Sequence, residues 1–167
     1  MIITQKDLLL EIGIKGPVEN LTKLDWKEIS YKYELTEEFI REFENEVSWI
    51  EISQKQKISE EFIREFQDKV HWLYASYFQT LSEDFIREFK EKVDWGCISA
   101  KQNLSNDFLL EFGSKIKWNT YFSHQEADFS IMEEFISQTD YEDMKDFKIS
   151  HLNKIQIGEI QKRLNSK

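Results

Sequence analysis

The chain has 167 residues, of which 40% are hydrophobic, and its formal net charge is −10 at pH 7. This charge repels nucleic acid and anionic membranes, so we expect direct binding to neither. The apolar content excludes a disordered tail, and the presence of only 5 Gly and 1 Pro predicts a helical chain with short connections.

Residues 1–20 predict a capping helix followed by a loop. The stretch "QKDLLLEI" at 5–12 resembles "SNDFLLEF" at 105–112, and Gly16 and Pro17 then interrupt the pattern. The start of the chain lacks the features of a signal peptide, and no stretch reaches the ~18–20 apolar residues of a membrane span. One cysteine, Cys97, cannot form an internal disulfide, which favours a reducing compartment. We therefore expect a cytoplasmic protein, in the host cytoplasm if it is encoded by a virus or phage.

A repeat of 23 residues organises the rest of the chain. The five tryptophans are Trp26, Trp49, Trp72, Trp95 and Trp118, each 23 residues after the last, and one more step reaches Tyr141. A fixed period of this size indicates a stacked array. We predict one repeat domain over 1–167, with the repeats in 21–148.

The first half of each repeat predicts a helix of about three turns. It follows a hydroxyl or acidic residue that is a good N-cap, and its apolar positions share one helical face, as in Phe85, Ile86, Phe89 and Val93. Acid–base pairs four residues apart occupy the other face, which indicates a solvated surface. The expected caps are Thr36, Ser59, Ser82, Ser105 and Asp128, and the expected pairs are Glu37–Arg41, Glu60–Arg64, Glu83–Arg87, Glu65–Lys69, Glu88–Lys92 and Glu111–Lys115.

The second half predicts a helix of about two turns that begins near the tryptophan or Tyr141, with Asp25, Ser48, Asp94 or Asp140 as cap. A serine follows the tryptophan by four residues and is expected to let helices approach closely. A glutamine follows it by seven and shares its face. This glutamine ladder has two interpretations: amides that bind a peptide backbone, or buried amides that satisfy loop carbonyls of the next repeat. Its members are Gln56, Gln79, Gln102 and Gln125.

The last segment, 149–167, predicts an amphipathic capping helix with Ser150 as its cap. Since one helix pair cannot bury its own apolar face, neighbouring repeats must stack. The predicted fold class is therefore all-α: a short α-solenoid of stacked helix–turn–helix repeats with degenerate capping helices at both ends.

Candidate binding residues lie on the short helices, at positions one, two, five and six after the tryptophan, which point away from the stack. In the third repeat all four are apolar or aromatic, whereas charged and small residues dominate elsewhere. Exposed clusters of this kind mark interfaces. The alternatives to a partner interface are packing against the N-terminal loop or a helix of the same chain, and a homodimer contact. The candidates are Tyr31, Ile50, Leu73, Tyr74, Tyr77 and Phe78.

Residue patterns for catalysis are missing from the sequence. The histidines His71, His124 and His151 have no metal-ligand spacing, no Cys-x-x-Cys exists, and no glycine-rich phosphate loop is present. We expect a protein that is not an enzyme, with no catalytic residues, metal site or cofactor.

The repeat, with "LSEDFIREFKEKVDW" followed by "IS" and a glutamine, resembles short tandem helical repeats in proteins of giant DNA viruses, phages and some bacteria. The resemblance covers about 21–148. It implies a repeat type and no catalytic residues.

Two functional hypotheses follow. The first is a non-catalytic module that binds a protein partner through the exposed face of the short helices. The second is an acidic virus- or phage-encoded inhibitor that blocks a nucleic-acid-binding host defence protein by presenting carboxylates. Its candidate residues are spaced by one repeat: Glu42, Glu65, Glu88, Glu111 and Glu134.

Overall fold

The computed structural model describes residues 7, 9, 10, 12–138 and 147–165. In this part of the chain there are eleven α-helices, two 3₁₀ helices and no strand. The all-α class and the stacked helix–turn–helix repeats are confirmed. The chain divides into two compact units, 1–79 and 80–167, and each is described by itself. Tyr141, the sixth position of the period, and its expected cap Asp140 lie outside the described residues.

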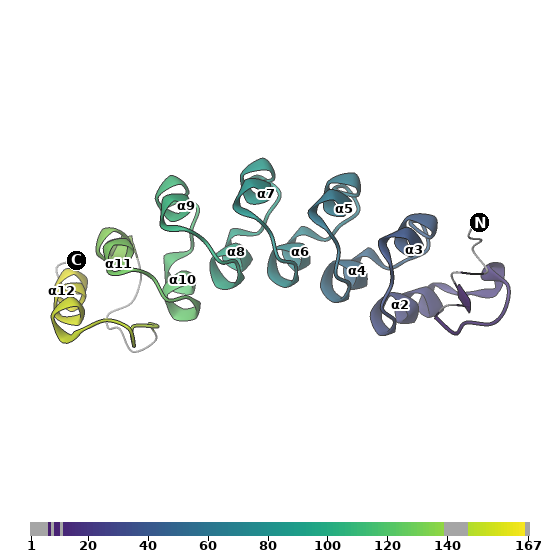
Figure 1. Cartoon of the computed structure of the whole chain (residues 1–167), viewed down its shortest axis with the longest axis horizontal. Helices are drawn as coiled ribbons and strands as arrows, with labels where there is room; N and C mark the ends of the chain where they lie inside the picture. The colour runs from purple at the N-terminus through teal and green to yellow at the C-terminus, as the bar shows by residue number, and fades with distance from the viewer. Residues whose placement is uncertain (1–6, 8, 11, 139–146, 166–167) are drawn as a thin grey trace. The chain divides into compact units, whose positions relative to one another are not determined.

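The first unit consists of two alternating rows of helices (Figure 1). In one row, α2 packs against α4, and α4 packs against α6. The other row holds α3 and α5. Near the N-terminus, Leu9 is buried, and Gly13 follows the helical residues with a φ of 79°, a left-handed conformation that suits glycine. The elements are η1 (Val18–Asn20), α2 (Lys23–Lys32), α3 (Glu37–Glu42), α4 (Trp49–Lys55), α5 (Glu60–Glu65) and α6 (Trp72–Phe78).

The second unit repeats this arrangement. Here α8 packs against α10, α9 against α11, and the terminal helix α12 against α11 and η2. Ile160 and Leu164 of α12 are buried. The elements are α7 (Glu83–Glu88), α8 (Trp95–Lys101), α9 (Asn106–Glu111), α10 (Trp118–His124), α11 (Phe129–Phe135), η2 (Ile136–Gln138) and α12 (Lys154–Leu164).

Side-chain caps start many of the helices. At the first helix of four repeats, the predicted hydroxyl accepts a hydrogen bond from the backbone N–H three residues later, whereas Asp128 forms no such bond. Asp94 caps α8 as predicted. The prediction of Ser150 as the cap of the last helix is wrong, because Asn153 accepts hydrogen bonds from the N–H groups of Ile155 and Gln156. The first-half caps that form are Thr36, Ser59, Ser82 and Ser105.

The cap predicted for α2 is also wrong. Thr22, and not Asp25, is the N-cap, and α2 begins three residues before Trp26. Thr22 and Asp25 form a reciprocal capping box, in which each side chain accepts a hydrogen bond from the other residue's N–H. The hydrogen bonds from Thr22 lower the pKa of Asp25. Asp25 therefore acts as the third residue of the helix and not as its cap.

In the second to fifth repeats, the first helix is shorter than the three turns predicted. In the second repeat, α3 ends after six residues, where Phe43 leaves helical geometry with φ −110° and ψ 31°. The chain then turns, and the N–H of Val47 donates to the Phe43 carbonyl over 3.0 Å. The helical spacing of apolar residues in the sequence does not distinguish a continuous helix from a shorter helix followed by such a turn.

This early end changes the partners of the lysines that were expected to pair within the helix. Lys69 lies in the turn after α5, and its Nζ is 3.4 Å from Glu44 Oε2 of the preceding repeat. Likewise, Lys115 Nζ is 3.0 Å from Glu91 Oε1. The charges thus link neighbouring repeats. The three predicted pairs with arginine do form within their helices: Glu37–Arg41, Glu60–Arg64 and Glu83–Arg87.

Within each unit, tryptophans lie between successive repeats, as predicted. Trp49 packs on two phenylalanines of the following repeat, with ring centroids 6.1 Å from Phe62 and 4.9 Å from Phe66. Its indole Nε1–H donates to the Glu44 carbonyl over 2.9 Å, so the polar edge is satisfied. Each aromatic pair adds about 0.5–1.5 kcal/mol beyond its buried area.

The serine four residues after the tryptophan is more than a small side chain. The Ser53 hydroxyl donates to the Trp49 carbonyl over 2.7 Å and accepts from the His71 N–H of the following repeat over 2.8 Å. Ser30 forms the same two bonds, with Trp26 and Ser48. The serine therefore satisfies the first free N–H of the next short helix, a role that alanine or glycine could not fill.

Candidate functional site

The candidate binding residues lie on the row of short helices in the first unit. Tyr31 is near the end of α2, Ile50 is near the start of α4, and the other four are on α6. Five are exposed and Tyr74 is half-buried. We call this set the aromatic surface: Tyr31 (57% exposed), Ile50 (50%), Leu73 (45%), Tyr74, Tyr77 (38%) and Phe78 (46%).

The aromatic surface is where exposed apolar side chains concentrate. Of the nine large hydrophobic side chains that are exposed among the described residues, five belong to it. The other four are separate in the sequence: Leu10, Leu24, Leu110 and Ile155. Scattered exposed leucines are ordinary, whereas a contiguous exposed apolar patch marks a candidate interface.

Ring contacts order the part of the surface that lies on α6. The Tyr77 and Phe78 rings meet edge to face, with centroids 4.7 Å apart. Tyr74 lies 6.1 Å from Phe78 and stacks on His71 at 4.5 Å. His71 is the N-cap residue of α6, and its side chain forms no cap bond. In the sequence, the only indication of this stack was a histidine at a position where the other repeats have aspartate, serine or lysine.

Comparison of equivalent positions in neighbouring repeats shows a charged pair in one and an apolar pair in the next. Lys27 Nζ on α2 is 3.9 Å from Glu51 Oε1 on α4. The residues 23 positions later, which occupy the equivalent places on α4 and α6, are Ile50 and Tyr74. At the equivalent positions of the next repeat, the ion pair is thus replaced by two side chains whose burial by a partner would be favourable in free energy.

A second replacement lies one turn further along the helices. Lys55 Nζ lies over the Tyr31 ring, 4.9 Å from its centroid. The equivalent residues one repeat later are Gln54 and Phe78, so the cation is replaced by an aromatic ring. On the second unit, these outward positions of α8 hold small residues and a lysine: Gly96, Cys97, Ala100 and Lys101.

The glutamine ladder is structural. The Gln56 side chain is buried, and its Nε2 donates to the carbonyls of Ser30 (2.9 Å) and Tyr33 (2.7 Å). Its Oε1 accepts from the Leu35 N–H over 2.8 Å. The amide therefore caps the last free carbonyls of α2, which have no partner within their own helix. The expectation that these carbonyls belong to the next repeat is wrong, because they belong to the preceding one.

The same arrangement recurs along the chain. Gln79 Nε2 donates to the carbonyls of Ser53 and Gln56, and its Oε1 accepts from the Ile58 N–H. In the second unit, the Gln102 Oε1 accepts from the Leu81 N–H. These amides hold adjacent repeats together and offer no ladder of groups for a peptide.

Carboxylates of the predicted acidic row take part in ion pairs. Glu65 Oε2 accepts from Arg41 Nε over 2.8 Å, and Glu111 Oε2 accepts from Arg87 Nε over 2.9 Å. The hydrogen bond that Arg41 donates to Glu65 raises the pKa of the arginine. Each pair joins successive repeats. The other members of the row are Glu42, Glu88 and Glu134, of which Glu42 and Glu88 also have interaction partners.

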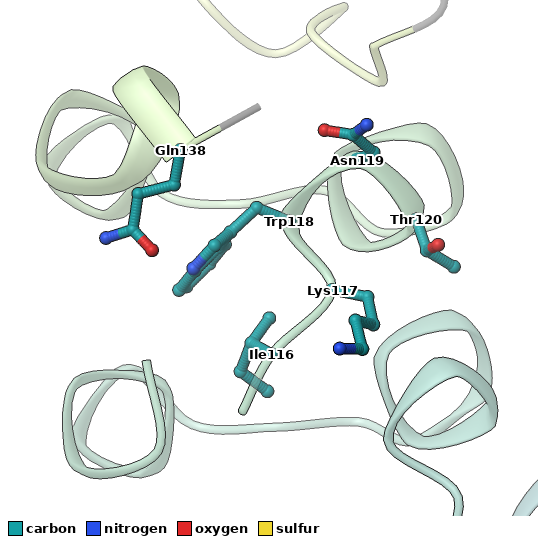
Figure 2. A pocket seen from close by; sticks show the side chains of 6 residues that line it. All are labelled: Ile116, Lys117, Trp118, Asn119, Thr120 and Gln138. Carbon is teal, nitrogen blue, oxygen red and sulfur yellow. The ribbon is translucent and has the colours of Figure 1, made fainter. Parts of the chain in front are cut away.

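Shallow hollows lie on the described surface of each unit. One of them, of about 330 Å³, is in the second unit, and Figure 2 shows the Trp118 side chain between those of Gln138 and Ile116. Lys117, Asn119 and Thr120 complete its lining. Two others, about 220 Å³ each, are in the first unit.

Side chains that could bind a metal ion or act as nucleophiles do not cluster in the described part of the chain. No group of histidine, cysteine, aspartate and glutamate there could hold a metal ion. His124 and His151 each bond a backbone carbonyl, of Thr120 and Ala127 respectively. Burial, followed by a hydrogen bond with Asp94, raises the pKa of Cys97 to about 11. A thiol with this pKa is a poor nucleophile at neutral pH.

Comparisons with known proteins add no family. The chain matches no protein-family model, no curated protein and no solved structure. Within the described residues, no helix has the length and apolar character needed to cross a membrane.

Proposed function

We propose that this chain is a non-catalytic module that binds a protein partner through the aromatic surface. The concentration of exposed apolar side chains on α2, α4 and α6 carries the proposal. Large rings with a polar edge, such as tyrosine, contribute strongly to protein interfaces at low cost in side-chain entropy. The replacement of a charged pair by Ile50 and Tyr74 supports the same conclusion, since stacking of the repeats does not require it.

The test is quantitative affinity capture from cell lysate with wild type and a Tyr77→Ser/Phe78→Ser variant. Both side chains are exposed, so we expect both proteins to show the same helical circular dichroism. The matched control is Leu24→Ser/Leu110→Ser, which removes exposed apolar side chains elsewhere. A protein captured by wild type and the control, and lost from the surface variant, is expected. Equal capture by all three would contradict the proposal.

The acidic inhibitor remains a second hypothesis with weaker support, because Glu65 and Glu111 are engaged with arginines of the preceding repeats. It predicts a basic partner whose capture falls steeply with added salt. Capture through the aromatic surface should instead persist at high salt, so the same experiment separates the two.

We further propose that the partner is a host protein and that binding takes place in the cytoplasm. The resemblance of the repeat to those of giant DNA viruses, phages and some bacteria favours a host partner. The lone cysteine favours a reducing compartment.

A further inference from the structure

A basic hollow adjoins the aromatic surface. Lys55, at the end of α4, and Lys57, just beyond it, both line a hollow of about 220 Å³. The one carboxylate in its lining is that of Glu34, and Leu35 and Gln56 complete it. Both lysines are exposed, and neither forms an ion pair with a described residue. The hollow therefore carries an excess of positive charge on a chain whose net charge is −10.

Two pairs of opposite charges on α2 and α4 already compensate each other. Glu28 pairs with Lys32 over 3.5 Å on α2, and Glu51 pairs with Lys27 over 3.9 Å between α2 and α4. Helix α6 contains no charged residue. Among the described residues, the partner of Lys55 is the face of the Tyr31 ring, an interaction that leaves its ammonium able to bind an anion.

We propose that the partner segment is both apolar and acidic. Its apolar side chains cover Ile50, Leu73 and Phe78, and one carboxylate binds Lys55 and Lys57 at the hollow. This inference rests on the proposed function and defines the chemistry of the partner. Because the rest of the chain repels acids, a single carboxylate at a fixed distance from the apolar residues fits better than a run of acids.

The experiment selects random linear peptides displayed on phage against the full-length folded chain. We expect enriched sequences in which one aspartate or glutamate keeps a constant spacing from two or three apolar residues. A synthetic peptide of the leading sequence is then titrated by fluorescence polarisation. With Lys55→Glu/Lys57→Glu, binding should weaken roughly 10- to 100-fold, the range for a lost charge-assisted contact. Exchanging the peptide's acid for lysine should restore binding to this variant.

Two controls separate the causes of a loss. Lys117→Glu/Lys154→Glu makes the same change in net charge on the second unit and should leave binding within a factor of two to three, since both lysines of the hollow stay in place and a change in net charge alone is largely screened by salt. Tyr77→Ser/Phe78→Ser should abolish peptide binding.

Each outcome decides a different claim. Peptides that need Tyr77 and Phe78 but bind the lysine variant equally well would overturn the acidic preference and leave the proposed function intact. A library that yields no peptide dependent on either site would overturn both for linear segments. Binding of a fluorescent oligodeoxythymidine, lost with the lysine variant, would replace the protein segment with single-stranded nucleic acid.

Discussion

Gln56→Leu tests whether the glutamine ladder holds the repeats together. The substitution keeps the approximate size of the side chain and removes three hydrogen bonds, two donated to the carbonyls of Ser30 and Tyr33 and one accepted from the Leu35 N–H. A buried hydrogen bond contributes about 0.5–1.5 kcal/mol net, so the three together give about 3 kcal/mol of lost stability. Backbone groups left buried without partners would add to this cost.

Two assays measure this loss. Urea unfolding followed by circular dichroism gives the total free energy, and amide hydrogen exchange locates it. Exchange of the Leu35 N–H, which donates directly to Gln56, should accelerate roughly a hundredfold, because each 1.4 kcal/mol is about a factor of ten. Local exchange is informative because repeat arrays need not unfold in one step.

The matched control is Gln54→Leu on the same helix. Gln54 is half-buried and forms no hydrogen bond with a described residue, so this change should alter stability by no more than about 0.5 kcal/mol. If Gln56→Leu costs no more than the control, or if exchange at Leu35 is unchanged, the ladder does not stabilise the stack.

Other predictions concern the second unit. Gly113→Ala should destabilise the chain by about 1–3 kcal/mol in urea unfolding, because a Cβ there would lie 2.7 Å from Phe135 Cε1. Gly158→Ala should instead stabilise by about 0.5–1 kcal/mol, since it lies within α12 with open space around its Cβ; equal effects would contradict the packing at Phe135. Cys97, whose pKa of about 11 reflects burial and Asp94, should react with iodoacetamide at pH 8 roughly 100-fold more slowly than in the urea-unfolded chain. That rate should rise steadily as the pH approaches 11, and a rate already at its maximum at pH 8 would refute the raised pKa.

The sequence predicted the repeat and most of its local structure because these depend on neighbours along the chain. Capping by Ser59 or Ser105 requires only an N–H three residues away, and the pair Glu37–Arg41 requires only one helical turn. Comparison between repeats also predicted the exposure of Ile50 and Leu73, since a position that varies between equivalent helices faces away from the stack.

Contacts between repeats were decided by the tertiary structure. The sequence offered Lys69 a partner in Glu65, but the helix ends at Glu65, and Lys69 reaches Glu44 instead. A period shows that positions are equivalent and does not show in which direction a side chain crosses to its neighbour. Stacking fixed that direction for Gln56, whose amide must reach the free carbonyls at the end of the preceding short helix.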